Sequence, residues 1–164
     1  MRIYLTGFMG SGKSTVGRLL SEKLSVPFID LDKEIELHLS HPVAEVFESH
    51  GEFYFRDQES AMLKSIRTDP LVMATGGGCF IHNREWMLEN GIIIFLDAKF
   101  SDIVRRIGGD PDRPLWKNAE RLYVERLNEY KHANFTVDAS GTAEEVLERI
   151  TVLPLLEQKR TPEN

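Results

Sequence analysis

The sequence lacks the features expected of a secreted protein, a membrane protein or a nucleic-acid-binding protein. It has one cysteine, Cys79, so it cannot form an internal disulfide, and this favours a reducing compartment. Its longest apolar run, Ile92 to Leu96, is far too short to cross a bilayer, and the N-terminal residues show no signal-peptide core. No long basic cluster is present, and 26 Asp and Glu residues outnumber 20 Lys and Arg residues. These absences predict a cytoplasmic protein with no membrane or nucleic-acid partner.

The length and composition suit one globular domain. The chain has 164 residues, of which 41% are hydrophobic and 28% are charged. Typical domains have roughly 100–150 residues, and a chain of this size buries most of its apolar surface without disulfides or metals. No internal repeat or low-complexity block interrupts it. We therefore expect a single domain over residues 1–164, ending in a polar tail over about 154–164.

Strand-like and helical segments alternate along the chain. Short, apolar, β-prone segments are predicted at 2–6, 28–30, 71–75, 92–96 and 135–138. Helices are predicted from residue 13 up to Pro27, at 33–39, 42–49, 52–66 and 83–90, in a segment that ends at Arg106, and at 118–131 and 142–150. This alternation predicts an α/β fold with a five-stranded parallel sheet covered by helices on both faces.

A P-loop pattern, Gly-x-x-x-x-Gly-Lys-Ser at 7–14, lies between a predicted strand and a predicted helix. In this pattern, backbone N–H groups and the positive end of the helix dipole face a phosphate. Lys13 is expected to reach the β- and γ-phosphates of a nucleotide, and the Ser14 hydroxyl to bind Mg²⁺. The alternative is a glycine-rich turn that matches by chance, and the agreement of motif and context disfavours it. The predicted nucleotide site comprises Gly10, Ser11, Gly12, Lys13, Ser14 and Thr15.

The P-loop does not by itself identify the reaction. Guanine-binding GTPases normally carry an Asn-Lys-x-Asp element, and this sequence has none. An Asp-x-x-Gly match at 138–141 lies near the end of the chain, where a strand-to-helix turn is the better interpretation. The sequence therefore directs attention to a second substrate that accepts a phosphoryl group.

Two carboxylates, Asp30 and Asp32, follow the second predicted strand. Alternate residues of an extended chain point the same way, so both are expected to face the cleft at the carboxyl ends of the strands. Asp30 would then hold Mg²⁺ through water, and Asp32 would accept a proton from a substrate hydroxyl. The alternative is a pair of solvated turn carboxylates before a helix.

Arg56 and Glu59 are three residues apart on a predicted helix, which allows them to form an ion pair. If their side of the helix faces the core, Glu59 would hold Arg56 ready for a bidentate contact with a carboxylate. If it faces solvent, the pair contributes little. The local pattern does not decide between these two interpretations.

Two glycine-containing segments are candidates for ligand contact. Gly76-Gly77-Gly78 follows a strand directly, where three glycines have no evident structural need, so close approach of a ligand is the functional interpretation and a flexible turn is the alternative. The segment 108–114 has two glycines and two prolines and is predicted to be a loop with hinge potential. Arg113 within it is a candidate for stabilising the transferring phosphoryl group, or else an exposed loop arginine.

Several motifs occur in one order over nearly the whole chain. They are Gly-Phe-Met-Gly-Ser-Gly-Lys-Ser-Thr-Val-Gly at 7–17, Phe-Ile-Asp-Leu-Asp at 28–32, Gly-Glu-x-x-Phe-Arg-x-x-Glu at 51–59, Thr-Gly-Gly-Gly at 75–78, Arg-Pro-Leu at 113–115, and Arg126 four residues before Tyr130. In their order and spacing they resemble the shikimate kinase family. The resemblance implies a P-loop fold of the nucleoside-monophosphate-kinase type with a mobile lid. It also implies ATP-dependent phosphorylation of the 3-hydroxyl of shikimate, in the pathway to chorismate and the aromatic amino acids.

The same resemblance implies roles for residues on the acceptor side. Asp32 would hold the shikimate hydroxyls and act as the base. Arg56 and Arg126 would bind the shikimate carboxylate, and Gly77 and Gly78 would approach the ring. The helices over about 33–60 would form the shikimate-binding part of the domain.

On the nucleotide side, Lys13 and Arg113 would stabilise the transferring phosphoryl group together with Mg²⁺, and Arg106 would lie against the adenine. The lid would cover about residues 108–118. The resemblance further implies a monomer that binds ATP and shikimate.

Two other classes of function remain open. A kinase for another small acceptor, such as gluconate or a nucleoside monophosphate, fits the same scaffold; gluconate also carries a carboxylate, whereas a nucleotide base fits the two arginines and three glycines less well. A non-catalytic, nucleotide-sensing module is disfavoured because Lys13, Asp32 and Arg113 are all present.

Overall fold

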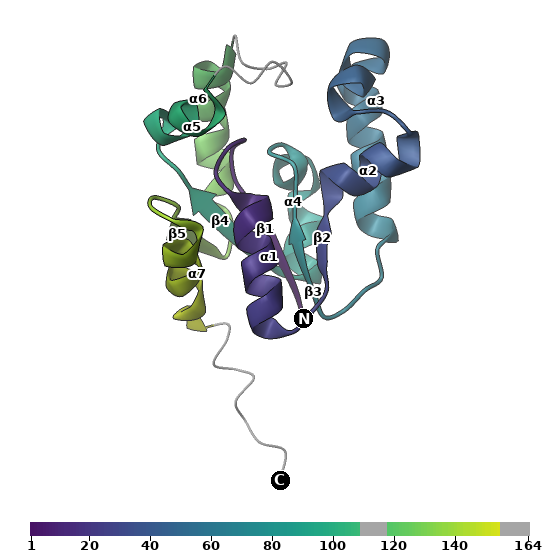
Figure 1. Cartoon of the computed structure of the whole chain (residues 1–164). Coiled ribbons are helices and arrows are strands. Elements are labelled where there is room, and N and C mark those ends of the chain that lie inside the picture. The colour runs from purple at the N-terminus through teal and green to yellow at the C-terminus, as the bar shows by residue number, and fades with distance from the viewer. Residues whose placement is uncertain (109–117, 155–164) are drawn as a thin grey trace.

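A computed structural model of the chain describes residues 1–108 and 118–154. It contains a five-stranded, all-parallel sheet in the order β2-β3-β1-β4-β5 (Figure 1). The strands are β1 (Arg2–Thr6), β2 (Phe28–Asp30), β3 (Leu71–Ala74), β4 (Ile92–Asp97) and β5 (Phe135–Asp138). The predicted fold class and all five strands are confirmed, with the ends of β3 and β4 displaced by one residue.

Helices cover both faces of this sheet. In Figure 1, α1 (Lys13–Leu24) and α7 (Ala143–Thr151) lie in front of the sheet, and α4 (Cys79–Asn90) and α6 (Ala119–Tyr130) lie behind it. The other helices are α5 (Phe100–Ile107), α2 (Leu31–Leu39) and α3 (Val43–Ser65), and the last two pack against each other on the β2 side. No helix within residues 1–108 and 118–154 is both long enough and apolar enough to span a bilayer.

Two helix starts differ by two residues or more from the sequence-based predictions, whereas the two helices predicted at 42–49 and 52–66 are both present. α2 begins at Leu31, so Asp32 is helical and the extended-chain argument that paired it with Asp30 was wrong. The helices predicted at 42–49 and 52–66 form α3 across a kink at Gly51, where φ is 83° and ψ is 172°. α4 begins at Cys79 rather than at 83, directly after the three glycines.

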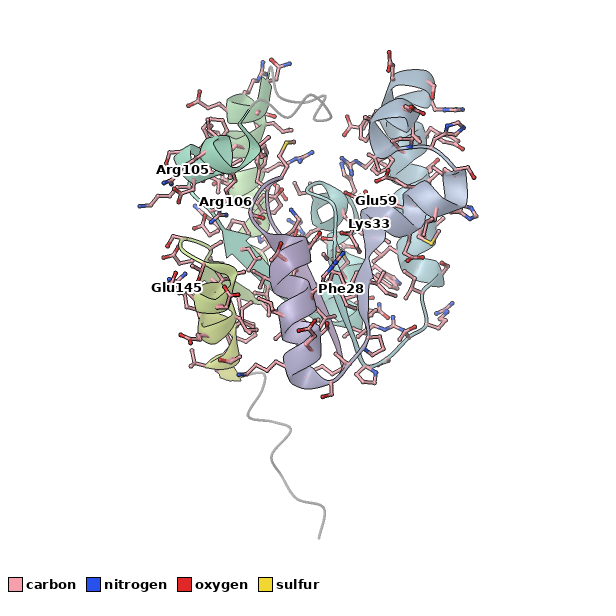
Figure 2. All side chains as sticks on the ribbon, in the orientation of Figure 1. Phe28, Lys33, Glu59, Arg105, Arg106 and Glu145 are labelled. Carbon is pink, nitrogen blue, oxygen red and sulfur yellow. The ribbon has the colours of Figure 1, made fainter. Side chains whose placement is uncertain are left out.

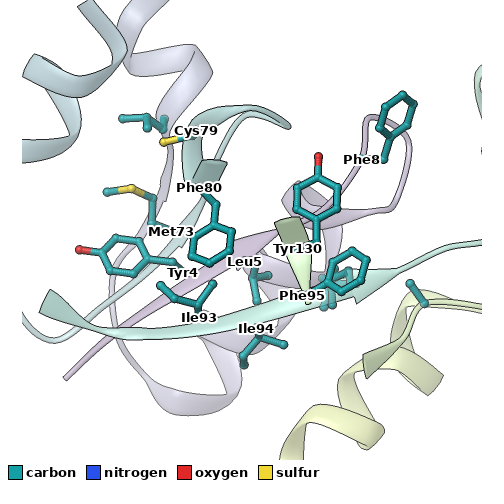
Figure 3. Close-up of a cluster of buried hydrophobic side chains, with 14 of the residues drawn as sticks. Tyr4, Leu5, Phe8, Met73, Cys79, Phe80, Ile93, Ile94, Phe95 and Tyr130 are labelled. Carbon is teal, nitrogen blue, oxygen red and sulfur yellow. The ribbon is translucent and has the colours of Figure 1, made fainter. Parts of the chain in front are cut away.

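The core consists of the sheet and the helix faces packed on it. β3 and the centre of β4 are buried along their lengths, as expected for parallel strands covered on both sides. Figure 3 shows this packing around Leu5, Ile93 and Phe95, with Phe80 of α4 and Tyr130 of α6 on the same side. The rings of Phe95 and Tyr130 stack with centroids 4.9 Å apart. This packing fixes α4 and α6 relative to the ends of the strands, where the predicted site residues lie.

Candidate active site

The predicted functional residues gather at the carboxyl ends of β1, β2 and β3. The P-loop follows β1, Asp30 ends β2, and the Gly-Gly-Gly turn follows β3. A cavity of about 390 Å³ opens there and is lined by side chains and backbone from all three segments, including Lys13, Ser14, Asp30, Asp32, Gly76 and Gly77. Open α/β sheets bind ligands at this edge. The helical position of Asp32 thus brings it to the same cavity that the sequence argument expected.

The P-loop is shaped by glycines with left-handed backbone conformations. Gly10 and Gly12 have φ values of 76° and 91°, which residues with side chains rarely adopt. The ammonium group of Lys13 donates hydrogen bonds to the carbonyl oxygens of Gly7 and Phe8 at 2.8 and 2.9 Å. Inside the loop, the Ser11 hydroxyl is buried and has no hydrogen-bond partner among the residues that the structure describes. The loop thus presents a backbone cradle with a lysine folded over it.

Ser14 and Asp30 lie in direct contact at the start of α1 and the end of β2. The Ser14 hydroxyl donates a hydrogen bond to Asp30 Oδ2 at 2.6 Å. The other carboxylate oxygen of Asp30 caps α2 by accepting from the Lys33 N–H. Asp30 therefore caps a helix, but it is partly buried and bonded to Ser14, so it is not the solvated turn carboxylate of the alternative interpretation. The contact with Ser14 places two oxygen donors together beside the P-loop.

Asp32 is partly buried at the wall of the cavity. Its Oδ1 atom is buried and has no hydrogen-bond partner in the part of the chain that the structure describes. Burial raises the pKa of Asp32, and the nearby Lys13 partly opposes this shift. The interpretation of Asp32 as a solvated turn carboxylate is wrong.

Arg56 and Glu59 form a buried ion pair on α3. Glu59 has no exposed side-chain surface and Arg56 is 12% exposed, and Arg56 Nη1 donates to Glu59 Oε2 at 2.7 Å. The Arg56 guanidinium also lies 5.7 and 5.3 Å from the ring centroids of Phe47 and Phe55. Burial raises the pKa of Glu59 to about 7, outweighing the opposing effect of Arg56. The core-facing interpretation of this pair is therefore confirmed.

The three glycines after β3 make room for charged side chains of the protein itself. A Cβ atom on Gly76 would lie 2.8 Å from Asp32 Oδ1, one on Gly77 would lie 2.9 Å from Arg126 Nη1, and one on Gly78 would lie 2.4 Å from Arg56 Nη2. The expectation that the turn has no structural need for three glycines was wrong. Each glycine leaves the space that one predicted site residue occupies.

Arg126 reaches the same turn from α6 on the opposite side of the cavity. It is 8% exposed, and its guanidinium lies 5.9 Å from the ring centroid of Phe8 in the P-loop. One turn later on α6, the Tyr130 hydroxyl donates a hydrogen bond to the Gly77 carbonyl. Burial raises the pKa of Tyr130 to about 12, so the phenol stays protonated as the donor. The two predicted carboxylate-binding arginines therefore border consecutive residues of one turn.

Arg106 lies on the other side of α1 from Glu59 and Lys33 (Figure 2). Its guanidinium donates to the carbonyl oxygens of Gly10 at 3.2 Å and Ala139 at 2.8 Å. It borders a separate cavity of about 200 Å³, which Ser11 and Thr15 also line. Arg113 and most of the predicted lid, residues 109–117, lie outside the described residues.

Comparison with known proteins agrees with this geometry. A family model described as shikimate kinase matches residues 9–153. A shikimate kinase of Sulfurihydrogenibium sp. is 41% identical over 160 residues, which cover 90% of this chain and 96% of the relative. The chain belongs to the shikimate kinase family. The solved shikimate kinase of Acinetobacter baumannii in complex with shikimate is 34% identical, with a TM-score of 0.88 and coverage of 98% of this chain and 95% of that one.

Family membership places the chain among ATP-dependent kinases, which are transferases. A gluconokinase of Sinorhizobium meliloti also shares the fold, with a TM-score of 0.65 and 17% identity over 96% of this chain and 94% of that one. At that identity the likeness concerns the fold alone. The fold by itself therefore does not exclude the gluconate alternative, whereas the family match favours shikimate.

The structure adds Glu59 and Tyr130 to the site residues predicted from sequence. Glu59 was expected only as a partner of Arg56, and its complete burial beside Asp32 is a tertiary feature. Tyr130 was noted only for its spacing from Arg126. The sequence signal available for each was its spacing: Glu59 is three residues after Arg56, and Tyr130 is four residues after Arg126. Such spacings put two residues on the same face of a helix.

Proposed function

We propose that the chain transfers the γ-phosphoryl group of ATP to the 3-hydroxyl of shikimate, giving shikimate 3-phosphate and ADP. The convergence of Arg56 and Arg126 on Gly78 and Gly77, beside Asp32, carries this proposal. Two buried guanidinium groups select a carboxylate, because their planar N–H donors match its two oxygens. A small carboxylated polyol therefore fits this half of the cavity better than a nucleobase does.

Asp32 is proposed as the base that accepts the proton of the attacking hydroxyl. Its raised pKa makes the ionised carboxylate a stronger proton acceptor than an exposed aspartate. Its Oδ1 atom has no hydrogen-bond partner among the described residues, so the carboxylate is not fully satisfied before a substrate binds. Lys13, close enough to lower the pKa of Asp32, links this base to the phosphate side of the cavity.

Ser14 and Asp30 are proposed to hold Mg²⁺, with Asp30 acting through water. Their oxygen atoms, 2.6 Å apart, are hard donors of the kind that Mg²⁺ prefers. Among residues 1–108 and 118–154, no group of three or more His, Cys, Asp or Glu side chains is placed to hold a metal. This fits Mg²⁺, which usually keeps several waters and relies on one or two protein ligands with the nucleotide phosphates. When bound, the ion neutralises charge on those phosphates.

The remaining nucleotide contacts are assigned to the P-loop and to three basic side chains. Backbone N–H groups over Gly10 to Thr15 would surround the phosphates, and Lys13 would turn from its loop carbonyls toward the transferring group. Arg106 borders the cavity next to Ser11 and Thr15, which supports its assignment to the adenine. The role of Arg113 in stabilising the transferring phosphoryl group stays a prediction. Arg113→Ala should lower turnover more than it lowers the affinity for shikimate.

Acceptor-dependent ADP release tests the proposed function. The purified chain would be incubated with Mg²⁺ and ATP, adding shikimate, gluconate or a nucleoside monophosphate in turn, and the product's phosphorylated position would be read by NMR. Release that requires shikimate and collapses in Asp32→Asn supports the substrate and the base together. Release driven by gluconate or a nucleotide would overturn the substrate. ATP binding without any acceptor-dependent release would indicate a binding module.

We also propose that the enzyme acts as a cytoplasmic monomer. The single cysteine, Cys79, is fully buried, so the described fold contains no feature that depends on an oxidising compartment. Light scattering across a range of concentrations would test the monomer, since a self-associating chain would gain mass as it is concentrated.

A further inference from the structure

A buried glutamate with one unpartnered oxygen lies directly beside the proposed carboxylate-binding arginine. Glu59 Oε2 accepts the hydrogen bond from Arg56, while Oε1 is buried and has no hydrogen-bond partner among residues 1–108 and 118–154. A Cβ on Gly76 would lie 3.1 Å from Glu59 Oε1 and 2.8 Å from Asp32 Oδ1. The unpartnered oxygens of both carboxylates therefore flank one glycine of the cavity wall.

Charged and titratable groups face Glu59 from four helices. Arg56 lies on the same helix, α3, with Asp32 on α2, Cys79 on α4 and Arg126 on α6. The Cys79 thiol is neutral, because burial raises its pKa well above the ordinary value. Both arginines favour the ionised form of Glu59 and Asp32 disfavours it, yet burial still raises the pKa of Glu59 to about 7.

Acceptor binding changes this balance of charge. With both carboxylates ionised, Asp32, Glu59, Arg56 and Arg126 together are formally neutral. A substrate carboxylate on the two arginines adds one negative charge in a buried region, where an uncompensated charge is costly. It also competes with Glu59 for the Arg56 guanidinium, which Glu59 already contacts at 2.7 Å.

We propose that Glu59 takes up one proton on Oε1 when the acceptor carboxylate binds to Arg56 and Arg126. The proton comes from solvent, an O–H bond forms at Oε1, and Glu59 passes from an anion to a neutral acid, so the net charge of the site is restored. Oε2 remains an acceptor for Arg56 Nη1, which keeps the guanidinium in place. This inference rests on the proposed function, because it needs an acceptor with a carboxylate.

The proposal predicts a definite dependence of acceptor affinity on pH. Below about pH 6, Glu59 is already protonated in the free enzyme, so affinity is flat. Above about pH 7 the proton must be taken from solvent, so the dissociation constant for shikimate rises by as much as about tenfold per pH unit. Shikimate's own carboxylate does not titrate in this range, since carboxylic acids of this kind have pKa values of about 4.

Calorimetry of the wild-type chain tests this without any mutation. Shikimate would be titrated at pH 8 in HEPES and in Tris, and at pH 6 in MES and in Bis-Tris, because differences in buffer ionisation heat report the protons taken up. Phosphate and acetate buffers are avoided, since both anions suit the site itself. We expect about half a proton or more per shikimate at pH 8 and clearly less at pH 6.

Three variants assign the proton to Glu59. Glu59→Gln should abolish the uptake at pH 8 and remove the pH dependence of affinity. Glu52→Gln is the matched control, because Glu52 also pairs with Arg56 but its side chain is 61% exposed. His82→Gln is the second control, because His82 lies near enough to Arg56 and Arg126 to sense them. Both controls should keep the uptake.

The possible outcomes separate this inference from the proposed function. Shikimate binding with no proton uptake at pH 8, or with uptake that survives in Glu59→Gln, would overturn the inference and leave the proposed function intact. If Glu59→Gln fails to fold, the wild-type measurements at the two pH values decide. Absence of shikimate binding by the wild-type chain would overturn the proposed function and the inference with it.

Discussion

In the phosphate half of the cleft, residues 7–15 with Asp30, charged groups are hydrogen-bonded within the protein. Lys13 bonds two loop carbonyls, and Asp30 bonds Ser14 and the N-terminus of α2. The acceptor half comprises Asp32, Arg56, Glu59, Gly76–Gly78 and Arg126. Buried polar atoms on three of its charged side chains have no hydrogen-bond partner within residues 1–108 and 118–154. In the phosphate half the Ser11 hydroxyl shares that property, but it carries no charge.

This difference indicates how each half is prepared for its ligand. The phosphate half uses backbone geometry, which is complete before a nucleotide arrives. The acceptor half keeps desolvated charges close together, and burial raises the pKa of both Asp32 and Glu59. Unpartnered buried groups are costly, and such strain is expected where a ligand completes the bonding. Substitutions in the acceptor half should therefore have large effects on chemistry, acceptor affinity and pH response.

The largest expected effect is that of Asp32→Asn on turnover. Asn keeps the size of the side chain and removes the basic carboxylate, so kcat with shikimate should fall about 10²- to 10⁴-fold. ATP binding should change less than turnover, because the hydrogen bonds of Lys13 to Gly7 and Phe8 and that of Ser14 to Asp30 are separate from Asp32. Steady-state ADP release and a nucleotide titration measure the two quantities.

Asp57→Asn is the matched control, since Asp57 is exposed on α3. A loss in kcat of only a few-fold in Asp32→Asn would mean that Asp32 positions the acceptor without acting as its base. The two halves would then differ less in their chemistry than proposed.

The next effect is on stability, from the buried carboxyl of Glu59. The pKa of Glu59 rises from an ordinary 4.5 to about 7 on folding, so between these values the folded chain binds more protons than the unfolded chain. The stabilisation that the retained proton provides is complete below pH 4.5 and is lost as pH rises through 7. From pH 4.5 to 8, wild type should therefore lose up to about 3 kcal/mol of unfolding free energy relative to Glu59→Gln.

Urea denaturation of both chains at several pH values measures this difference. Titration of groups that the two chains share is largely removed by the comparison. A difference between the chains that stays constant from pH 4.5 to 8 would contradict the raised pKa of Glu59.

The difference between the two halves also explains which site residues could be predicted from the sequence. The phosphate half is contiguous, so its glycines, Lys13 and Ser14 were identified from one motif and its strand–helix context. The acceptor half joins four distant segments, and local patterns left Arg56 and the three glycines undecided until the family resemblance ordered them. The burial of Glu59 depends on how α3 packs on α4, which no local pattern contains.

The fold shows the same division. The strands were predicted almost to the residue, because buried parallel strands are short apolar runs bounded by turn residues. The predicted helix starts were less accurate. The N-terminus of α2 was placed two residues late, because the sequence Asp30-Leu31-Asp32 is compatible with the end of a strand and with a helix cap. In the structure, the Asp30 side chain accepts a hydrogen bond from the Lys33 N–H, and this bond identifies Asp30 as the cap and Leu31 as the first helical residue.

A third test concerns the geometry of the carboxylate contact. Arg56→Lys keeps the positive charge but replaces a planar guanidinium by a single ammonium group, so bidentate contact with a carboxylate is lost. KM for shikimate should rise about 10- to 50-fold, with a smaller change in kcat, because each good charge-assisted hydrogen bond contributes about 1.5–3 kcal/mol. Arg121→Lys is the control, since Arg121 is 83% exposed in a surface pair with Glu125. An unchanged KM would show that charge alone, without shape, selects the acceptor.

The smallest expected effect compares a glycine from each half. Gly12 has a φ of 91°, and a Cβ atom there would lie in open space with Val16 at 3.9 Å, so its requirement is conformational. Gly78 has an ordinary φ of −97°, but its Cβ would lie 2.4 Å from Arg56 Nη2, so its requirement is space.

The same change to Ala should therefore impair the binding of different substrates. Gly12→Ala should raise KM for ATP, and Gly78→Ala should raise KM for shikimate about tenfold. Stability should fall by about 1–3 kcal/mol in Gly78→Ala, because the displaced guanidinium belongs to the buried pair with Glu59. If Gly78→Ala instead raised KM for ATP, the two halves would be coupled through the turn, and their separation into a backbone site and a side-chain site would be wrong.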